Sequence, residues 1–286
     1  MESVRAVRTK QKTARWKGEE PMERQEILQA VHTRFAKKIY NPFNKALREF
    51  GMVQPGDRIA VCISGGKDSA LLGLLLDDLA ARQGFEVRFL AMDPGYPAEN
   101  RRQIEENMAQ LGLPLHVFET DVLRIAGTHS AEHPCFLCAK LRRGNLYAQA
   151  QALGCNKIAL GHHYDDAIET VLMGLLYGGQ VQAMLPRLAA KNYEGMELIR
   201  PLYFTREAAV QEWVEYCGLS FLPCACPAAQ RAQDTKRAEI KALIASLAAQ
   251  NPQIEANILN AVKNVDTAKV LGWRDAAGRH SFLDRL

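Results

Sequence analysis

Short apolar runs alternate with longer amphipathic segments through the middle of the chain, between residues 58 and 182. The apolar runs predict buried strands at 58–63, 86–92, 115–119 and 157–161. The segments between and after them carry apolar residues at helical spacing and predict helices at 68–83, 98–111, 139–153 and 165–177. Strands that alternate with helices are typical of a parallel sheet covered on both faces. The pattern therefore predicts an α/β fold, a parallel sheet flanked by helices in Rossmann-type layers.

The flanking regions are predicted to add helices at both ends. Residues 22–50 carry apolar side chains mostly three or four positions apart, which predicts amphipathic helices with a break or kink at Pro42. Later in the chain we expect a short strand within 196–203, a helix over 206–217 with Thr205 as its N-cap, helices over 234–249 and 252–265, and a weakly patterned tail over 268–286. The expected divisions are a mobile basic arm (1–20), a helical segment (21–55), a central domain (56–230) and a helical extension (231–286).

Composition bears on location and on partners. Hydrophobic residues make up 48% of the chain, yet no stretch approaches the roughly 18 apolar residues that a membrane span needs. The polar N-terminus lacks the apolar core of a secretory signal, so we expect a cytoplasmic protein without membrane contact. The net charge is +4, and residues 1–17 hold six cations against one acid. Such an arm suits a polyanion, although a solvated tail is an equally open interpretation.

A glycine-rich turn, Ser64-Gly-Gly-Lys-Asp-Ser69, lies between the first predicted strand and a predicted helix. Turn glycines let the backbone approach a phosphate closely, and the free N–H groups at a helix start point at it. The two serines add hydroxyl donors, and Lys67 adds a mobile positive charge. The spacing differs from the Walker pattern, which places four residues between its first glycine and the Gly-Lys pair. We interpret the turn as a phosphate-binding site made of Ser64, Gly65, Gly66, Lys67, Asp68 and Ser69.

The end of the second predicted strand carries a candidate nucleoside ligand, Asp93. Ligands of parallel α/β sheets bind at the carboxyl ends of the strands, so Asp93 is expected on the same rim as the phosphate turn. A carboxylate there would suit a ribose hydroxyl or an adenine amine. An aspartate before Pro-Gly is also a common turn residue, and the sequence does not separate the two interpretations.

A second turn with polar side chains follows the fourth predicted strand. Gly161 permits a close backbone approach, and His162 and His163 come directly after it. Asp165 and Asp166 then open a helix, where acids also stabilise the helix dipole. We favour a nucleotide and Mg²⁺ role for this turn, because Mg²⁺ prefers oxygen ligands such as carboxylates and phosphates.

Seven cysteines fall into two kinds of position. Cys62 lies inside a predicted strand, and Cys155 and Cys217 each lie beside a glycine near a helix end, so we interpret these three as structural. The others form two close pairs, Cys135-x-x-Cys138 and Cys224-Ala-Cys226. Paired spacings in a cytosolic protein favour metal or redox chemistry over disulfides.

The first pair begins a basic helix that continues through Arg142. Thiolates near a helix N-terminus and several cations have a lowered pKa, which suits metal binding or sulfur chemistry. Two cysteines cannot hold a metal centre alone. Adding one thiolate from the second pair would leave one corner of a [4Fe-4S] cluster open, whereas adding both would make a closed zinc or cluster site.

Several segments, taken together, carry a family resemblance. They are Gly56-Asp-Arg-Ile59, Ser64–Ser69, Cys135-x-x-Cys138-x-x-Leu141-Arg-Arg-Gly144, Lys157–His163, Asp165-Asp166, Tyr177-Gly-Gly179, Arg200-Pro-Leu202 and Pro223-Cys224. The chain resembles the tRNA 2-thiocytidine synthetase (TtcA) family of RNA sulfurtransferases, within the ATP-pyrophosphatase (PP-loop, adenylating) superfamily. The resemblance runs from about residue 30 to about residue 230.

That resemblance implies an adenine nucleotide alpha hydrolase-like fold, with 56–230 as the ATP-binding and thiolation domain. It implies that ATP adenylates the C2 carbonyl oxygen of a cytidine, releasing pyrophosphate, and that sulfur from a [4Fe-4S] cluster replaces the oxygen. The implied catalytic residues are Lys67, Asp68, Asp165, Asp166 and Arg142. The implied nucleotide ligands are the six residues of the phosphate turn, Asp93, Gly161 and His162. The implied cluster ligands are Cys135, Cys138 and Cys224, with Cys226 as the alternate.

The implied cofactors are ATP, Mg²⁺ and the [4Fe-4S] cluster. The implied partners are tRNA and a sulfur donor, either a cysteine desulfurase or free sulfide, and a homodimer is one option for the assembly. Two other functions stay open. A PP-loop ligase or amidating enzyme needs the phosphate turn but no cysteine ligands, and an RNA-binding protein with a structural zinc site needs no turnover. The paired cysteines favour the sulfurtransferase.

Overall fold

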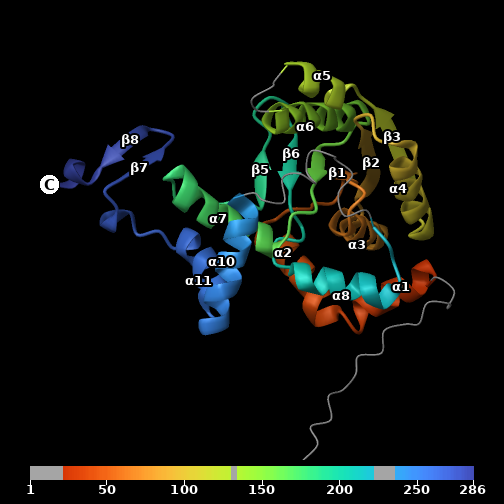
Figure 1. The fold of residues 1–286 in the computed structure, drawn as a ribbon, viewed down its shortest axis with the longest axis horizontal. Helices are drawn as coiled ribbons and strands as arrows, with labels where there is room; N and C mark the ends of the chain where they lie inside the picture. Colours follow the sequence, from red (N-terminus) through yellow and green to blue (C-terminus); the bar gives the residue numbers. More distant parts are fainter. Residues whose placement is uncertain (1–21, 130–133, 222–235) are drawn as a thin grey trace, which may run out of the picture. The chain divides into compact units, whose positions relative to one another are not determined.

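The computed structural model describes residues 22–129, 134–221 and 236–286, with backbone alone in 126–129 and 134–139. Within these ranges the main sheet has six strands in the order β3-β2-β1-β4-β6-β5 (Figure 1). The strands are β1 (Arg58–Cys62), β2 (Glu86–Asp93), β3 (Leu115–Glu119), β4 (Lys157–Ala159), β5 (Arg187–Ala189) and β6 (Glu197–Ile199). Each neighbouring pair is parallel except β5 with β6, which is antiparallel at one edge. The predicted parallel α/β sheet is confirmed.

Helices cover both faces of the sheet, as the alternation of elements predicts. The connecting helices are α3 (Lys67–Gln83), α4 (Ala98–Gln110), α5 (Val122–His129) and α6 (Pro134–Ala152). Figure 1 shows α3 and α6 on opposite sides of the strands. Outside α3 lie α8 (Glu207–Cys217) and the N-terminal segment of α1 (Arg24–His32), the π-helix η1 (Ala36–Tyr40) and α2 (Asn41–Glu49).

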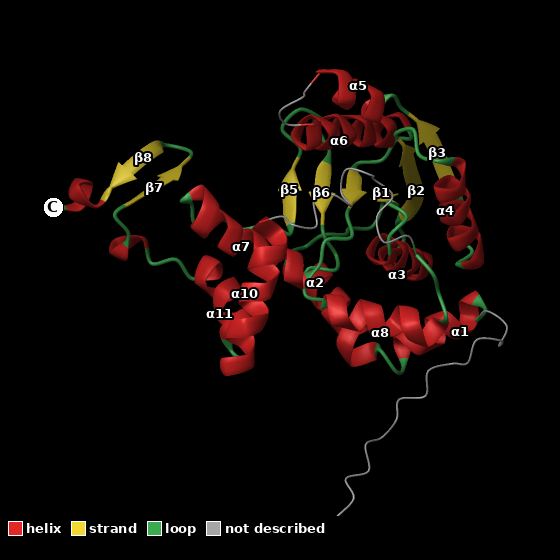
Figure 2. Cartoon of the chain, viewed as in Figure 1, coloured by secondary structure: helices red, strands yellow, loops and turns green. Residues whose placement is uncertain are grey.

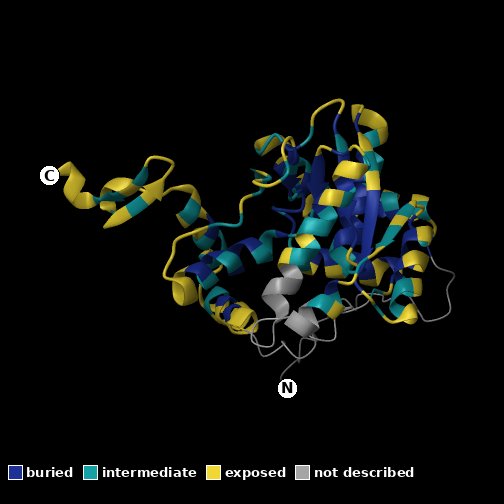
Figure 3. Cartoon of the chain, turned by 90° about the horizontal axis from the view of Figure 1, so that it is seen from above, coloured by how far each residue is buried: buried dark blue, intermediate teal, exposed yellow. Residues whose placement is uncertain are grey.

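The core follows from the two-residue period of the strands. On the face towards α6, Ala60 and Cys62 of β1 pack with Tyr147 and Cys155 in one buried cluster. Ile59 and Val61 alternate with them and are also fully buried, because helices cover both faces. Figure 3 shows the strands as the most buried part of the molecule.

The contacts divide the chain into two compact units, which are described separately. The first comprises residues 1–163 and 186–230, and the second comprises 164–185 and 231–286. In the second unit, α7 (Tyr164–Gly178) contacts both α10 (Lys236–Gln250) and α11 (Ile254–Lys263). Its remaining elements are η3 (Thr267–Lys269), the hairpin β7 (Gly272–Asp275) and β8 (Gly278–Ser281), and η4 (Phe282–Arg285) (Figure 2). The helix after the second polar turn thus packs with the C-terminal helices.

Three local predictions need correction. Thr205 is not the N-cap of α8: it is fully buried, its hydroxyl makes no hydrogen bond to any described residue, and Arg206 occupies the N-cap with extended backbone. The tail forms a hairpin, whose polar strands give no apolar alternation to detect. Helix α5 and the edge strand β5 were also not predicted.

At Pro42, where the sequence predicts a break or kink, the chain stays helical and changes from a π-helix to an α-helix. Pro42 lies in the first turn of α2, and the five residues before that helix form a π-helix. There the N–H of Asn41 donates to the carbonyl of Ala36, five positions back, whereas an α-helix bonds four positions back. No helix in the described ranges is both long and apolar enough to cross a bilayer.

Candidate active site at the phosphate-binding turn

The turn between β1 and α3 has a backbone that only glycine adopts easily. Gly65 has a φ of +86°, and a Cβ there would lie 2.7 Å from the Ile104 side chain. Gly66 is the N-cap of α3, with extended backbone and no side-chain cap. The first N–H groups of the helix therefore have no intrahelical acceptor, and they face the space where an anion would sit.

The two serines of the turn hold it in this shape. The Ser69 hydroxyl accepts from the N–H of Ser64 at 3.1 Å and donates to the carbonyl of Gly66 at 2.9 Å. The two hydroxyl oxygens are themselves 3.1 Å apart. The N–H of Gly66 donates to the Ser64 hydroxyl at 3.4 Å. The serine side chains, predicted as phosphate donors, thus also form the internal bonds that preorganise the turn.

Lys67 lies at the first position of α3 between two carboxylates. Its ammonium is 3.2 Å from Asp68 Oδ2 and 3.2 Å from Glu207 Oε1, and its side chain is 21% exposed. Partial burial alone would lower the pKa of Lys67, but the charges of Asp68 and Glu207 raise it above its ordinary value. The side chain therefore carries a full positive charge at the mouth of the turn.

Sequence reasoning missed Glu207. It comes from the first turn of α8, 140 positions away from Lys67, and its side chain is 31% exposed. An acid in the first turn of a helix ordinarily indicates only a favourable interaction with the helix dipole. Only the packing of α8 against α3 shows that this carboxylate shares the ammonium of Lys67.

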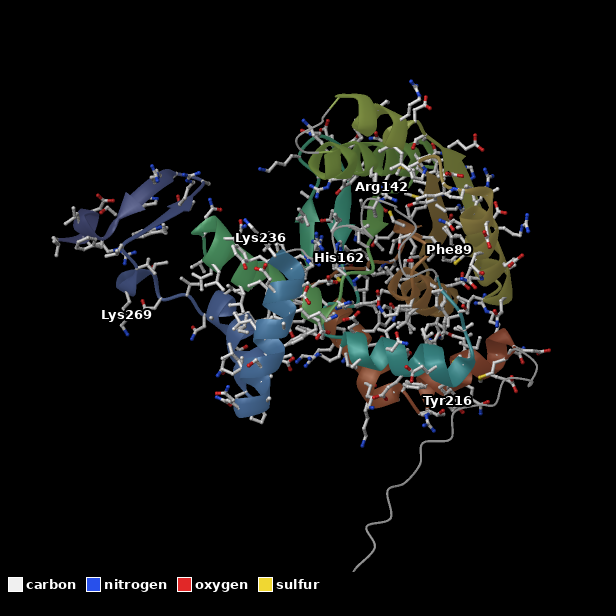
Figure 4. All side chains as sticks on the ribbon, viewed as in Figure 1. Phe89, Arg142, His162, Tyr216, Lys236 and Lys269 are labelled. Carbon is white, nitrogen blue, oxygen red and sulfur yellow. The ribbon has the colours of Figure 1, made fainter. Side chains whose placement is uncertain are left out.

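Gly161 lies in close contact with the backbone of the phosphate turn, and its expected approach to a nucleotide stays a prediction. A Cβ at Gly161 would lie 2.9 Å from the N atom of Ser69 and 3.0 Å from the carbonyl carbon of Asp68. The end of β4 is therefore packed directly against the first turn of α3. His163 is buried, and His162 lies in the same loop, on the path from β4 to α7 (Figure 4).

Asp93 and Arg142 are connected through one loop. Asp93 Oδ1 accepts from the N–H groups of Gly95 and Tyr96 at 2.9 and 2.8 Å, and Asp93 Oδ2 lies 3.7 Å from Arg101. Arg142, on α6, donates to the phenol oxygen of Tyr96 (Figure 4). The structure thus gives Asp93 the turn-forming role that the sequence offered as one of two interpretations. Asp93 also borders a hollow of about 360 Å³, so a nucleoside contact stays a prediction.

Asp165 and Asp166 open helix α7 of the second unit. Asp166 Oδ1 lies 2.8 Å from Arg237 of α10, which is also 3.6 Å from Glu169 Oε2. The Asp166 carboxylate therefore ties α7 to α10 within that unit. A role for either aspartate in holding Mg²⁺ stays a prediction.

The cysteines divide as the sequence predicts, as far as they are described. Cys62, Cys155 and Cys217 are buried, and burial raises the pKa of Cys62 to about 12 and also raises that of Cys155. Buried thiols of this kind make poor ligands and poor nucleophiles. Cys135 and Cys138 lie in the first turn of α6, where the side chains are outside the description. Cys224 and Cys226 lie outside the described residues altogether.

Comparison with known proteins agrees with this geometry. Residues 31–243 match the PP-loop domain family. The tRNA-cytidine(32) 2-sulfurtransferase of Syntrophotalea carbinolica is 37% identical over 84% of this chain and 94% of its own length. The protein of the same name from Geobacter sulfurreducens is 37% identical over 82% of this chain and 92% of its own length. In structure, the chain is similar to the U34-tRNA thiolase NcsA from Methanococcus maripaludis, solved with its [4Fe-4S] cluster, with a TM-score of 0.64 at 18% identity over 79% of each chain.

The parallel sheet, the glycine turn after β1 and the family match define a PP-loop protein. Within this class, the chain belongs to the family of the tRNA-cytidine(32) 2-sulfurtransferases. The resemblance drawn from the sequence motifs is confirmed. The similarity to NcsA supports the fold.

Proposed function

We propose that this protein is an ATP-dependent tRNA sulfurtransferase that converts a cytidine of tRNA into 2-thiocytidine. The observation that carries the proposal is the phosphate turn, with charged Lys67 at its mouth and open N–H groups behind it, in a chain 37% identical to proteins of that activity. A tRNA substrate also agrees with the cytoplasmic location expected from the sequence.

The proposed reaction begins with activation of the base. A carbonyl oxygen is a poor leaving group, and adenylation converts it into AMP. The C2 oxygen of cytidine attacks the α-phosphorus of ATP, and the bond to the bridging oxygen breaks, releasing pyrophosphate. Sulfur then forms a bond to C2, and the former carbonyl oxygen leaves as part of AMP. Each step is a substitution in which no atom of the base changes its oxidation state.

The turn supplies charge stabilisation for the first substitution. The N–H groups of Gly65, Lys67 and Asp68 would bind phosphate oxygens, and the Lys67 ammonium would move from its two carboxylates to the departing pyrophosphate. Asp68 would help to hold a Mg²⁺ ion, which when bound neutralises charge on the phosphates. For Asp165 and Asp166 the family resemblance implies a part in the adenylation step. Arg142, anchored at Tyr96, would meet the RNA or the adenylated base.

The sulfur is proposed to come from a [4Fe-4S] cluster held by Cys135, Cys138 and either Cys224 or Cys226. The chemistry of the donor set fits: the three described thiols are buried structural groups, and Cys135 and Cys138 lie at a helix start followed by Lys140, where thiolates are favoured. When bound, such a cluster supplies an activated sulfur atom. A cysteine desulfurase or free sulfide would replenish it.

The test is a reconstituted reaction under anaerobic conditions with tRNA, ATP and sulfide. We expect AMP and pyrophosphate to form. Nuclease digestion and mass spectrometry of the tRNA should show a new 2-thiocytidine peak. None of the three products should form without the other two. A thiolated uridine in place of a thiolated cytidine would contradict the proposal that the substrate base is a cytidine. AMP and pyrophosphate formation with a colourless, zinc-loaded protein and no thionucleoside would favour a ligase-type reaction instead.

A further inference from the structure

A second polar hollow lies away from the phosphate turn, where the N-terminal segment meets the C-terminal end of α3. Its volume is about 470 Å³. Its lining comes from η1, α2 and α3 and consists of Tyr40, Asn41, Asn44, Arg48, Leu79, Arg82 and Gln83. None of the proposed steps of thiolation uses any of these residues.

The lining is suited to an anion. It contains two guanidinium groups, three carboxamides and a phenol, and it contains no carboxylate. Arg48 is exposed and makes no ion pair with any residue of the described ranges. Guanidinium groups bind phosphate oxygens with two parallel hydrogen bonds, so an uncompensated arginine beside amide donors favours a phosphate.

The second arginine is held in place by a small network. Arg82 forms an ion pair with Asp78 and donates to the Tyr40 hydroxyl at 3.3 Å. Asp78 in turn lies 3.0 Å from His32 Nε2, and the His32 and Tyr40 rings pack edge to face with centroids 4.4 Å apart. Asp78 offsets part of the Arg82 charge. The network fixes the guanidinium at the rim, which lowers the entropic cost of binding a ligand there.

The position of the hollow decides the size of the ligand. Lys67 and Arg82 lie 15 residues apart on α3, and at 1.5 Å per residue they are roughly 22 Å apart along the helix axis. The triphosphate of one ATP molecule cannot span that length. A polynucleotide can, because it carries a backbone phosphate at every nucleotide along its length.

We propose that this hollow binds a backbone phosphate of the tRNA, at a nucleotide remote from the base that is modified. The inference rests on the proposed function for the identity of the RNA. Arg48 and Arg82 make the phosphate contact, and Asn41 and Asn44 add amide donors. The hollow acts as a positioning contact that carries no sequence information.

The experiment measures tRNA affinity against salt concentration for the full chain, wild type, Arg48→Gln and the double variant Arg48→Gln/Arg82→Gln. Losing one phosphate contact lowers the slope of log K against log salt by about 0.7–1. We expect that decrease, together with weaker binding at low salt. Arg48→Lys keeps the charge and should keep the slope. The matched control is Arg88→Gln, whose exposed guanidinium is already neutralised by Glu86 at 3.0 Å.

Three results would overturn the assignment: an unchanged slope in the double variant, an equal decrease in the Arg88 control, or stabilisation of the wild type alone by inorganic phosphate with no change in tRNA binding. The last would indicate a small-anion site. Both arginines are exposed, so folding should survive, and thermal melting checks this. The binding assay needs no turnover. A normal slope change without any 2-thiocytidine would contradict the proposed function and leave this inference standing.

Discussion

Two lysines at opposite edges of the same sheet have nearly the same partners and opposite consequences. At the carboxyl edge, Lys67 lies 3.2 Å from each of two carboxylates and is 21% exposed. At the amino edge, Lys157 lies 2.6 Å from Asp57 and 3.4 Å from Glu197 and is 4% exposed. The number of charges is the same, so the charges alone do not make a binding site.

The difference lies in what remains open around each ammonium. Lys157 also donates to the carbonyl of Met52, and Asp57 accepts from the side chain of Asn156 and the N–H of Gln54. Every group of that cluster is engaged with another part of the fold, which makes it a structural cross-link. Lys67 is partly exposed beside a helix start, whose first N–H groups have no intrahelical acceptor, so an anionic ligand can replace its carboxylate partners.

The largest effect is expected from breaking the buried cluster of Lys157, Asp57 and Glu197. Asp57→Ala leaves the buried ammonium of Lys157 with Glu197 as its one carboxylate partner, and we expect a loss of about 3–5 kcal/mol in the free energy of unfolding. Urea unfolding measures it. Glu86→Ala, which removes an exposed partner of Arg58, is the control and should change stability little. Equal losses of stability in both variants would show that the buried cluster at the amino edge contributes no more to stability than an exposed ion pair.

Breaking the partly exposed cluster of Lys67, Asp68 and Glu207 should lower the rate of catalysis and leave the stability of the fold nearly unchanged. Lys67→Ala removes the cation that we propose stabilises departing pyrophosphate, and we expect pyrophosphate release to fall about 100- to 1,000-fold. The thermal midpoint should stay close to that of the wild type. Lys191→Ala, at an exposed turn, is the matched control. Unchanged release by the Lys67 variant would remove the phosphate turn from the mechanism.

The contact between β4 and the turn can be probed by adding one methyl group. Gly161→Ala places a Cβ 2.9 Å from backbone that cannot move without shifting the turn. We expect a loss of about 1–3 kcal/mol of stability together with weaker ATP binding, measured by melting and calorimetry. Gly178→Ala is the control, because a Cβ there meets nothing closer than 4.0 Å. It should change neither stability nor ATP binding. Normal ATP binding by the Gly161 variant would mean that the turn tolerates displacement.

A smaller effect is expected from the carboxylate that sequence reasoning missed. Glu207→Gln keeps the size of the side chain and removes one competitor for the Lys67 ammonium. Because the group is partly exposed, we expect the KM for ATP to decrease only about 2- to 5-fold, with kcat nearly unchanged. Glu212→Gln, on the same helix and paired with Lys38, is the control. An increased KM would show that Glu207 assists binding.

The smallest effect is a pH dependence. Burial alone would raise the pKa of Asp57, but hydrogen bonds from Lys157, Asn156 and Gln54 and the Lys157 charge bring it below its ordinary value of 3.8. Its contribution to stability is therefore complete above that value and is lost as pH falls through the lower folded pKa. Wild type and Asp57→Asn should converge in stability on acidification below about pH 4. A constant difference down to pH 2 would contradict this.

The lysine comparison also shows where sequence reasoning succeeds and where it ends. Apart from α5, the strands and helices of 58–177 follow from local patterns, and so does the phosphate turn, because its residues are contiguous. Asp57 and Lys157 stood in matching family motifs, yet their sequence gave no sign that they pair with each other 100 positions apart. The same reason hid Glu207, since a contact between distant elements leaves no local pattern. The hairpin at 272–281 was missed because both of its faces are polar.

The π-helix at 36–40 has a consequence for how this family can vary. Its extra residue sets the rotation of everything that follows, since each residue turns a helix by roughly 100°. Removing one residue there would restore an ordinary helical ladder and swing Asn41 and Asn44 away from α3 while leaving the helix itself intact. Inserting or deleting a single residue at this point would therefore change which side chains border the hollow without interrupting the helix.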